Sequence, residues 1–127
     1  MKVAFTSSTG ETVDQHFGMA SAFSVWDITG EDASFVGKVE SISAEGDEED
    51  RISARADAIA GCVIVYTMQI GGPAAAKLVA RKIHPMKTNV AVPVAEIVEK
   101  LQAVLRGNPP PWLRKALSVR NGELSGE

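Results

Sequence analysis

The sequence is poor in cysteine, in long apolar runs and in positive charge. Cys62 is the single cysteine, so we expect no internal disulfide and no cysteine-rich zinc or iron–sulfur site built by this chain alone. The longest apolar run, residues 62–66, is far shorter than the roughly 20 residues that span a bilayer. No basic leader followed by an apolar stretch opens the chain. These absences predict a cytoplasmic protein without a membrane span.

The charge balance excludes a further class of function. Thirteen Lys and Arg residues stand against sixteen Asp and Glu residues, which gives a formal net charge of −3. Nucleic-acid binding needs a basic face, so this balance argues against a nucleic-acid partner. The 127 residues, 45% of them hydrophobic and 23% charged, are typical of one globular domain.

Hydrophobic patterning predicts five strands and three main helices. The expected strands cover residues 2–6, 22–28, 34–42, 62–67 and 88–92. The expected helices cover residues 51–60, residues 73–82 and a segment that Pro93 begins and Gly107 closes. The acidic stretch at residues 43–50 favours a solvated loop before the first helix, and a functional acidic patch is the alternative.

This element order predicts an α/β fold. A hairpin followed by alternating helices and strands implies a mixed five-stranded sheet with helices on both faces. Right-handed crossovers give the strand order 3-2-1-4-5, which is a ribonuclease-H-like topology. We expect this domain to cover residues 1–107. A proline-rich spacer, a short amphipathic helix at residues 112–117 and a flexible tail are expected within residues 108–127. Trp112 and its helix either cover the domain or dock a partner.

A ligand site is expected where the strand order reverses, beyond the carboxyl ends of the parallel strands. The loops at residues 7–18 and 68–72 meet there. The second loop leads through Gly71-Gly72-Pro73 into a helix, whose free N–H groups and dipole favour an anion. Nearby hydroxyls complete the predicted shallow anion pocket; they belong to Thr6, Ser7, Ser8 and Thr9.

The soft metal ligands divide between the two ends of the predicted sheet. His16 lies in the first loop, where no apolar periodicity buries it, and on this ground it is either a ligand or catalytic residue or an ordinary loop histidine. Met19 and Met68 lie at the same end, as packing residues or as soft contacts. Cys62 and His84 fall at the opposite end, so we interpret Cys62 as a small buried hydrophobe and His84 as a loop or capping histidine.

Enzymatic motifs are scarce. The sequence has neither a P-loop nor a Gly-x-Ser-x-Gly elbow, and a two-metal nuclease would need several carboxylates at the strand ends. Asp14 and Asp27 are the obvious acids near the early strands, and the fourth strand ends in Thr67 and Met68. A small metal-dependent hydrolase or phosphate-binding enzyme that uses Asp14 and His16 is the alternative function.

Three motifs, in order, resemble the dinitrogenase iron–molybdenum cofactor-binding domain family. They are K-V-A-F-T-S-S with V-D-Q-H-F-G at residues 2–8 and 13–18, C-V-I-V-Y leading to I-G-G-P at residues 62–66 and 70–73, and P-P-W-L-R-K-A-L at residues 110–117. The last motif is similar to the NifX-type members in particular.

The resemblance implies a non-catalytic carrier in nitrogen fixation. Such a carrier binds the nitrogenase iron–molybdenum cofactor, or its iron–sulfur precursor, and passes it from a cluster donor to an acceptor among the assembly proteins, as a monomer or weak dimer. His16 of the His-Phe-Gly motif is then the metal ligand. A single imidazole suits a cluster that must be released, whereas building a cluster takes several thiolates. The expected cofactor-binding residues are His16, Ser7, Ser8, Phe17, Gly18, Met68, Gly71 and Gly72.

Overall fold

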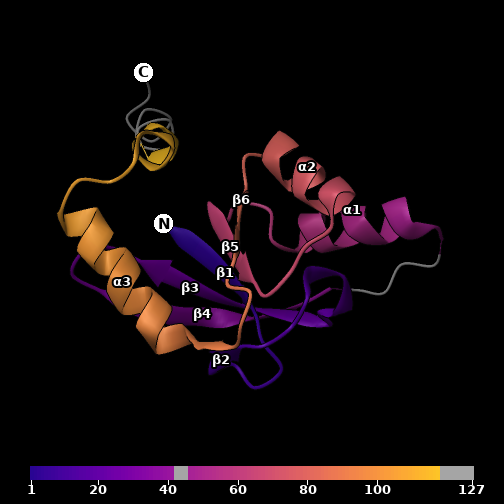
Figure 1. Ribbon diagram of the computed structural model, residues 1–127, viewed down its shortest axis with the longest axis horizontal. Helices are drawn as coiled ribbons and strands as arrows, with labels where there is room; N and C mark the ends of the chain where they lie inside the picture. The colour runs from indigo at the N-terminus through magenta and orange to yellow at the C-terminus, as the bar shows by residue number, and fades with distance from the viewer. Residues whose placement is uncertain (42–45, 118–127) are drawn as a thin grey trace.

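The computed structural model describes residues 1–41 and 46–117, and its centre is a five-stranded mixed sheet (Figure 1). The strands are β1 (Lys2–Thr6), β3 (Ala22–Ile28), β4 (Ala33–Glu40), β5 (Ile64–Thr67) and β6 (His84–Lys87), in the order β4-β3-β1-β5-β6. Two short strands, β2 (Thr12–Val13) and β7 (Val92–Pro93), pair separately as an antiparallel ribbon. The expected mixed five-stranded sheet is confirmed, and the flexible tail predicted beyond residue 117 lies outside the described residues.

Strand β1 is where the sheet changes from antiparallel to parallel pairing. It runs antiparallel to β3, with Lys2 opposite Asp27, and parallel to β5, with Val3 opposite Ile64. Because β1 and β5 are parallel, the loops that follow them leave from the same edge of the sheet. This edge is the one at which the sequence places the candidate ligand site.

The prediction of a sheet strand over residues 88–92 is wrong. The edge strand is β6, which pairs in parallel with β5 from His84 opposite Ile64 to Lys87 opposite Thr67. Its Pro85 lacks an N–H, which a sheet tolerates at an edge strand. The fifth strand of the sheet therefore consists of other residues than predicted, and His84 is a strand residue rather than a loop or capping histidine.

The helices are η1 (Phe17–Met19), α1 (Glu48–Ala58), α2 (Gly72–Ala80) and α3 (Val94–Arg106), followed by a short helix at residues 111–117. Helix α1 begins earlier than predicted because Asp47 and Asp50 form a reciprocal capping box. The Asp50 N–H donates to the Asp47 carboxylate over 2.9 Å, and the Asp47 N–H donates back over 3.3 Å. The prediction of a loop is therefore wrong for residues 48–50. Within the described part of the chain, no helix has the length and hydrophobicity to cross a membrane.

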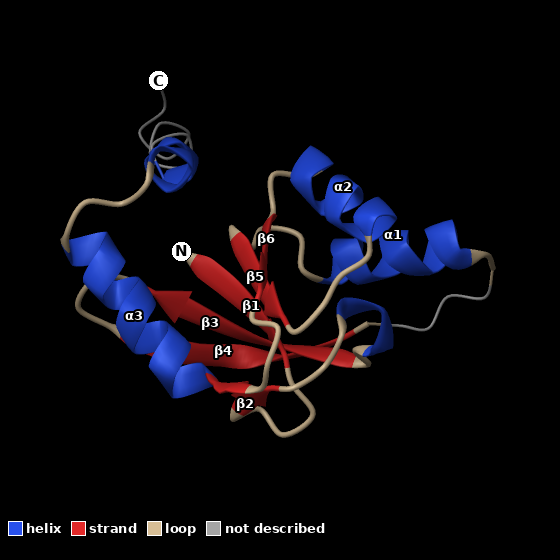
Figure 2. Ribbon diagram, viewed as in Figure 1, coloured by secondary structure: helices blue, strands red, loops and turns tan. Residues whose placement is uncertain are grey.

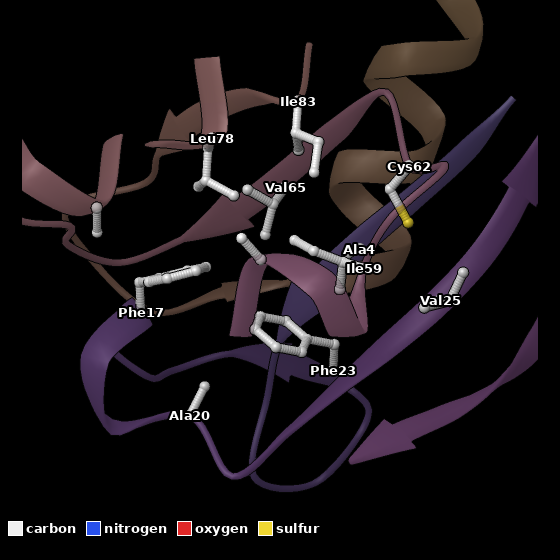
Figure 3. Close-up of a cluster of buried hydrophobic side chains, with 12 residues drawn as sticks. Ala4, Phe17, Ala20, Phe23, Val25, Ile59, Cys62, Val65, Leu78 and Ile83 are labelled. Atoms are coloured by element: carbon white, nitrogen blue, oxygen red, sulfur yellow. The ribbon is translucent and has the colours of Figure 1, made fainter. Parts of the chain in front are cut away.

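The sheet is covered on both faces (Figure 2). One core cluster joins the sheet to α1 and α2 (Figure 3), and we call it the α1/α2 core. It contains Phe17, Phe23, Ile59, Leu78 and the buried Cys62, among others. The other cluster, the α3 core, contains Phe5, Ile64, Ile97, Val98 and Leu101, among others. Successive residues of β1 alternate between the two, since Ala4 belongs to the α1/α2 core and Val3 and Phe5 to the α3 core.

The helix at residues 111–117 packs against the domain. Leu113 is 1% exposed and belongs to the α3 core. The Trp112 ring stacks on the His84 imidazole of β6, with ring centroids 3.8 Å apart and planes 12° apart. Trp112 and Leu113 therefore join the helix both to the edge strand and to the core.

The stacked His84 predicts a pH dependence of stability. Burial lowers the pKa of His84, so the folded protein binds this proton less tightly than the unfolded chain does. Its contribution to stability is present above the unfolded pKa and is lost as the pH falls through the folded pKa. We expect the free energy of unfolding, measured by urea denaturation from about pH 7 down to about pH 5, to fall less steeply in His84→Gln than in the wild type. Equal slopes in the two proteins would contradict this account.

Candidate functional site

Two loops converge at the carboxyl edge of β1 and β5. The Phe17 N–H donates to the Gln69 carbonyl oxygen over 2.9 Å, and the Met68 N–H donates to the Gln15 carbonyl oxygen over 3.0 Å. These reciprocal bonds tie the segment after β1 to the segment after β5. The structure thus brings together the two loops that the topology predicts to meet.

Hydrogen bonds fix the backbone around His16, while its side chain is exposed. The Gln15 carbonyl oxygen accepts three hydrogen bonds: from Thr6 Oγ1 at 2.9 Å, Thr67 Oγ1 at 3.0 Å and Met68 N at 3.0 Å. The His16 carbonyl oxygen accepts from the Met19 N–H at 3.0 Å, which closes the turn of η1. The His16 side chain nevertheless remains exposed. A fixed backbone with an exposed imidazole is the arrangement needed to offer one nitrogen ligand to something in solution.

Phe17 anchors the same turn in the core. Its ring is 1% exposed and lies against Phe23, with ring centroids 5.7 Å apart (Figure 3). Because Phe17 follows His16 directly, the buried ring and the exposed imidazole leave the chain at adjacent positions. Burial of Phe17 therefore helps to fix where His16 is presented.

A cavity of about 230 Å³ lies beside this turn. Phe17 and Gly18 line it from η1, and Gly71, Pro73 and Ala74 line it from the start of α2. The predicted meeting of the His-Phe-Gly turn with the Gly-Gly-Pro helix start is therefore a physical hollow rather than a flat surface. His16 directly precedes Phe17, the first residue of the lining.

The start of α2 presents open backbone to this cavity. Gly71 is the N-cap residue, and within the described chain no side chain caps the helix there. Gly71 has an ordinary φ of −75°, and a Cβ at Gly72 would meet nothing within 4 Å, so neither glycine is required by backbone strain or close packing. Pro73 has no N–H and the Ala75 N–H donates to the Gly71 carbonyl oxygen, so the Gly72 and Ala74 N–H groups are the first-turn donors that favour an anion there.

The predicted hydroxyls have other partners. Ser7 Oγ accepts from the Thr9 and Gly10 N–H groups at 3.3 and 2.8 Å, and Thr6 Oγ1 donates to the Gln15 carbonyl oxygen. The Ser8 N–H and Oγ both donate to the Asp14 carboxylate. These bonds order the loop after β1. The hydroxyl groups that the sequence predicts for an anion pocket therefore already have hydrogen-bond partners within the protein.

The remaining predicted residues spread over different surroundings. Met68 is half-buried and packs against the α3 core. It therefore lies on the opposite side of the sheet from the α1/α2 core. Met19 is 76% exposed beside the turn. Cys62 is buried in the α1/α2 core, as predicted for a small hydrophobe. Among residues 1–41 and 46–117, no three His, Cys, Asp or Glu side chains are grouped so as to hold a metal ion.

Sequence reasoning misses two cationic residues of the site. Arg51 and Arg55 of α1 both line the cavity. Their spacing of four residues places them on one face of a helix, which is visible in the sequence. Nothing in the sequence shows that this face of α1 lies across from η1 and the start of α2.

Comparison with known proteins gives consistent matches. The family described as "Dinitrogenase iron-molybdenum cofactor" matches residues 1–104. Protein NifX of Herbaspirillum seropedicae is 42% identical over 122 residues, which cover 92% of this chain and 82% of that protein. Protein NifY of Azotobacter vinelandii is 40% identical over 119 residues, which cover 94% of this chain and 49% of that protein. The crystal structure of PH0822 is similar with a TM-score of 0.64 and 26% identity, over 81% of this chain and 89% of that chain.

Proposed function

The chain belongs to the dinitrogenase iron–molybdenum cofactor family, and on that premise we propose that it is a carrier that binds the iron–molybdenum cofactor of nitrogenase, or an iron–sulfur precursor, during cofactor maturation. The observation that carries this proposal is the exposed His16 on a fixed backbone at the carboxyl edge of β1 and β5. The cluster is cargo in this role, and His16 supplies the protein ligand to its metal.

The local chemistry supports a transient carrier rather than an enzyme. A single imidazole bond leaves most of a cluster free for the next protein, and amide and guanidinium donors complement its negative charge. Asp14, the acid that a hydrolase would need beside His16, accepts two hydrogen bonds from Ser8. Its carboxylate is thus engaged in ordering the loop, and no specific observation favours the hydrolytic alternative.

Finer features complete the proposal. The antiparallel β4-β3-β1 and parallel β1-β5-β6 halves of the sheet are consistent with a ribonuclease-H-like fold. The binding unit is the domain at residues 1–107, and the helix at residues 111–117 covers it through Leu113 and Trp112. The protein works in the cytoplasm between a cluster donor and an acceptor, as a monomer or weak dimer.

The direct test is retention of a cluster by the intact chain. Protein purified without oxygen is mixed with isolated iron–molybdenum cofactor and passed through a gel-filtration column under anaerobic conditions. We expect the visible absorption of the cluster, and its iron by metal analysis, to elute with the protein. The same experiment is repeated with an iron–sulfur precursor. Elution of a colourless, iron-free chain in both experiments would refute the carrier function.

A further inference from the structure

We propose that the cavity between η1, α1 and the start of α2 is a binding site for a small oxyanion, such as a carboxylate or phosphate group, and that Arg51 and Arg55 hold it. The site goes beyond the carrier role, since its contacts exist without a cluster.

Arg51 and Arg55 both line the cavity without a salt-bridge partner among the described residues. Arg51 Nη1 donates to the Gly46 carbonyl oxygen at 2.8 Å, and Arg55 Nε donates to the Ala20 carbonyl oxygen at 3.3 Å. These bonds orient the guanidinium groups without neutralising them. Of the residues that the structure describes, none forms an ion pair with either arginine, although Lys77 and Arg81 nearby pair with Glu49 and Asp57.

The opposite wall adds to the same electrostatic preference. Gly71, Pro73 and Ala74 line the cavity at the start of α2, where the helix dipole and the N–H groups of Gly72 and Ala74 favour a negative charge. Of the described lining residues, Glu48 carries the single negative charge, against the two guanidinium groups. A guanidinium group offers parallel N–H donors that match a carboxylate or phosphate in two-point contact. The cavity therefore has both the charge and the donor geometry for an oxyanion.

Size limits the ligand to a small group. The volume of about 230 Å³ is below the range of about 300–1,000 Å³ of pockets that enclose drug-sized ligands. Phe17, Ile52 and Ala74 supply its apolar lining, so the polar contacts concentrate at the arginines and the helix start. The His16 backbone adjoins this lining, because His16 directly precedes Phe17 in the chain. The anion is either a free one or an acidic group carried on the cargo.

The test uses citrate and inorganic phosphate as probes, in a buffer that contains neither. We expect at least one probe to shift the amide resonances of Gly18, Gly71 and Gly72 in nitrogen–proton correlation spectra, with saturation. Each lost charge-assisted contact is worth about 10-fold or more in affinity, so Arg51→Ala/Arg55→Ala should bind at least about 10-fold more weakly. The control Lys38→Ala/Arg114→Ala removes the same charge from exposed positions away from the cavity and should bind like the wild type.

Two results would overturn the site. One is the absence of any saturable shift with both probes, and the other is a loss of affinity in the control equal to that in the double arginine variant. Where the double variant fails to fold, Arg51→Gln decides, because Arg51 is exposed and its side chain donates to the backbone carbonyl oxygen of Gly46. In that case, unchanged binding in folded Arg51→Gln and in folded Arg55→Gln would overturn the site.

A last arm identifies the source of the anion. Citrate is added to wild-type protein loaded with cluster, and the retained iron is measured. Displacement of the cluster by citrate assigns the cavity to an acidic group of the cargo, whereas simultaneous binding assigns it to a free anion. Both results support the site. Because the first arm uses no cluster, a failure of the carrier function and a failure of the oxyanion site give different results.

Discussion

Replacing His16 by alanine is expected to abolish retention of the cluster while the fold stays intact. A structural zinc site with four ligands binds with about 10–16 kcal/mol, so one ligand is worth about 3 kcal/mol, or more than about 100-fold in affinity. In a site with a single side-chain ligand, few other bonds remain to compensate. His16 is exposed, and its loop is held by backbone bonds of Gln15 and Phe17 that the substitution leaves in place. Surface changes of this kind alter stability by less than about 0.5 kcal/mol.

The matched control is the other histidine of the chain. His84 lies in β6 and stacks on Trp112, at the end of β6 opposite to Lys87. His84→Ala should therefore retain cluster like the wild type after anaerobic gel filtration, even if it loosens the helix at residues 111–117. If His16→Ala retains as much iron as the wild type and His84→Ala, the assignment of the ligand is wrong, although the carrier function survives in the wild-type result.

The central strands could be predicted because their own residues determine them. The segments 2–6 and 22–28 match β1 and β3 to the residue, since each has a period-two pattern or a compact apolar run. Strand β6 could not be predicted in the same way. The residues His-Pro-Met-Lys contain no β-branched side chain and include a proline, so this segment becomes a strand through its pairing with β5. Long-range pairing of this kind leaves no local signal.

In the candidate site, too, some features could be predicted from the sequence and others depend on long-range packing. The approach of the His16 turn to the Gly71 helix start followed from topology, because parallel strands put their following loops at one edge. The roles of Ser7 and Ser8 depend on short-range turns, which satisfy their side chains inside the loop. The arginine pair of α1 depends on how that helix packs across the sheet, and this is set by core contacts that an isolated sequence does not display.

Replacing Phe17 by alanine is expected to give the largest loss of stability at the site. Truncating a fully buried phenylalanine costs about 3–5 kcal/mol, a large fraction of the 5–15 kcal/mol that stabilises a typical domain. The lost ring leaves a cavity in the α1/α2 core beside Phe23 and releases the turn that presents His16. We therefore expect weaker cluster retention even in the fraction that remains folded. Urea denaturation monitored by circular dichroism measures the first effect, and anaerobic gel filtration the second.

Met19→Ala is the matched control for this substitution. Met19 lies two residues further along the same turn but is 76% exposed, so its truncation should change the free energy of unfolding by less than about 0.5 kcal/mol. The comparison separates burial from position, because both variants shorten a large apolar side chain in η1. If Phe17→Ala is no less stable than Met19→Ala, the ring does not anchor the turn. If Phe17→Ala is unstable but its folded fraction retains cluster fully, then the hydrogen bonds of Gln15 alone suffice to present His16.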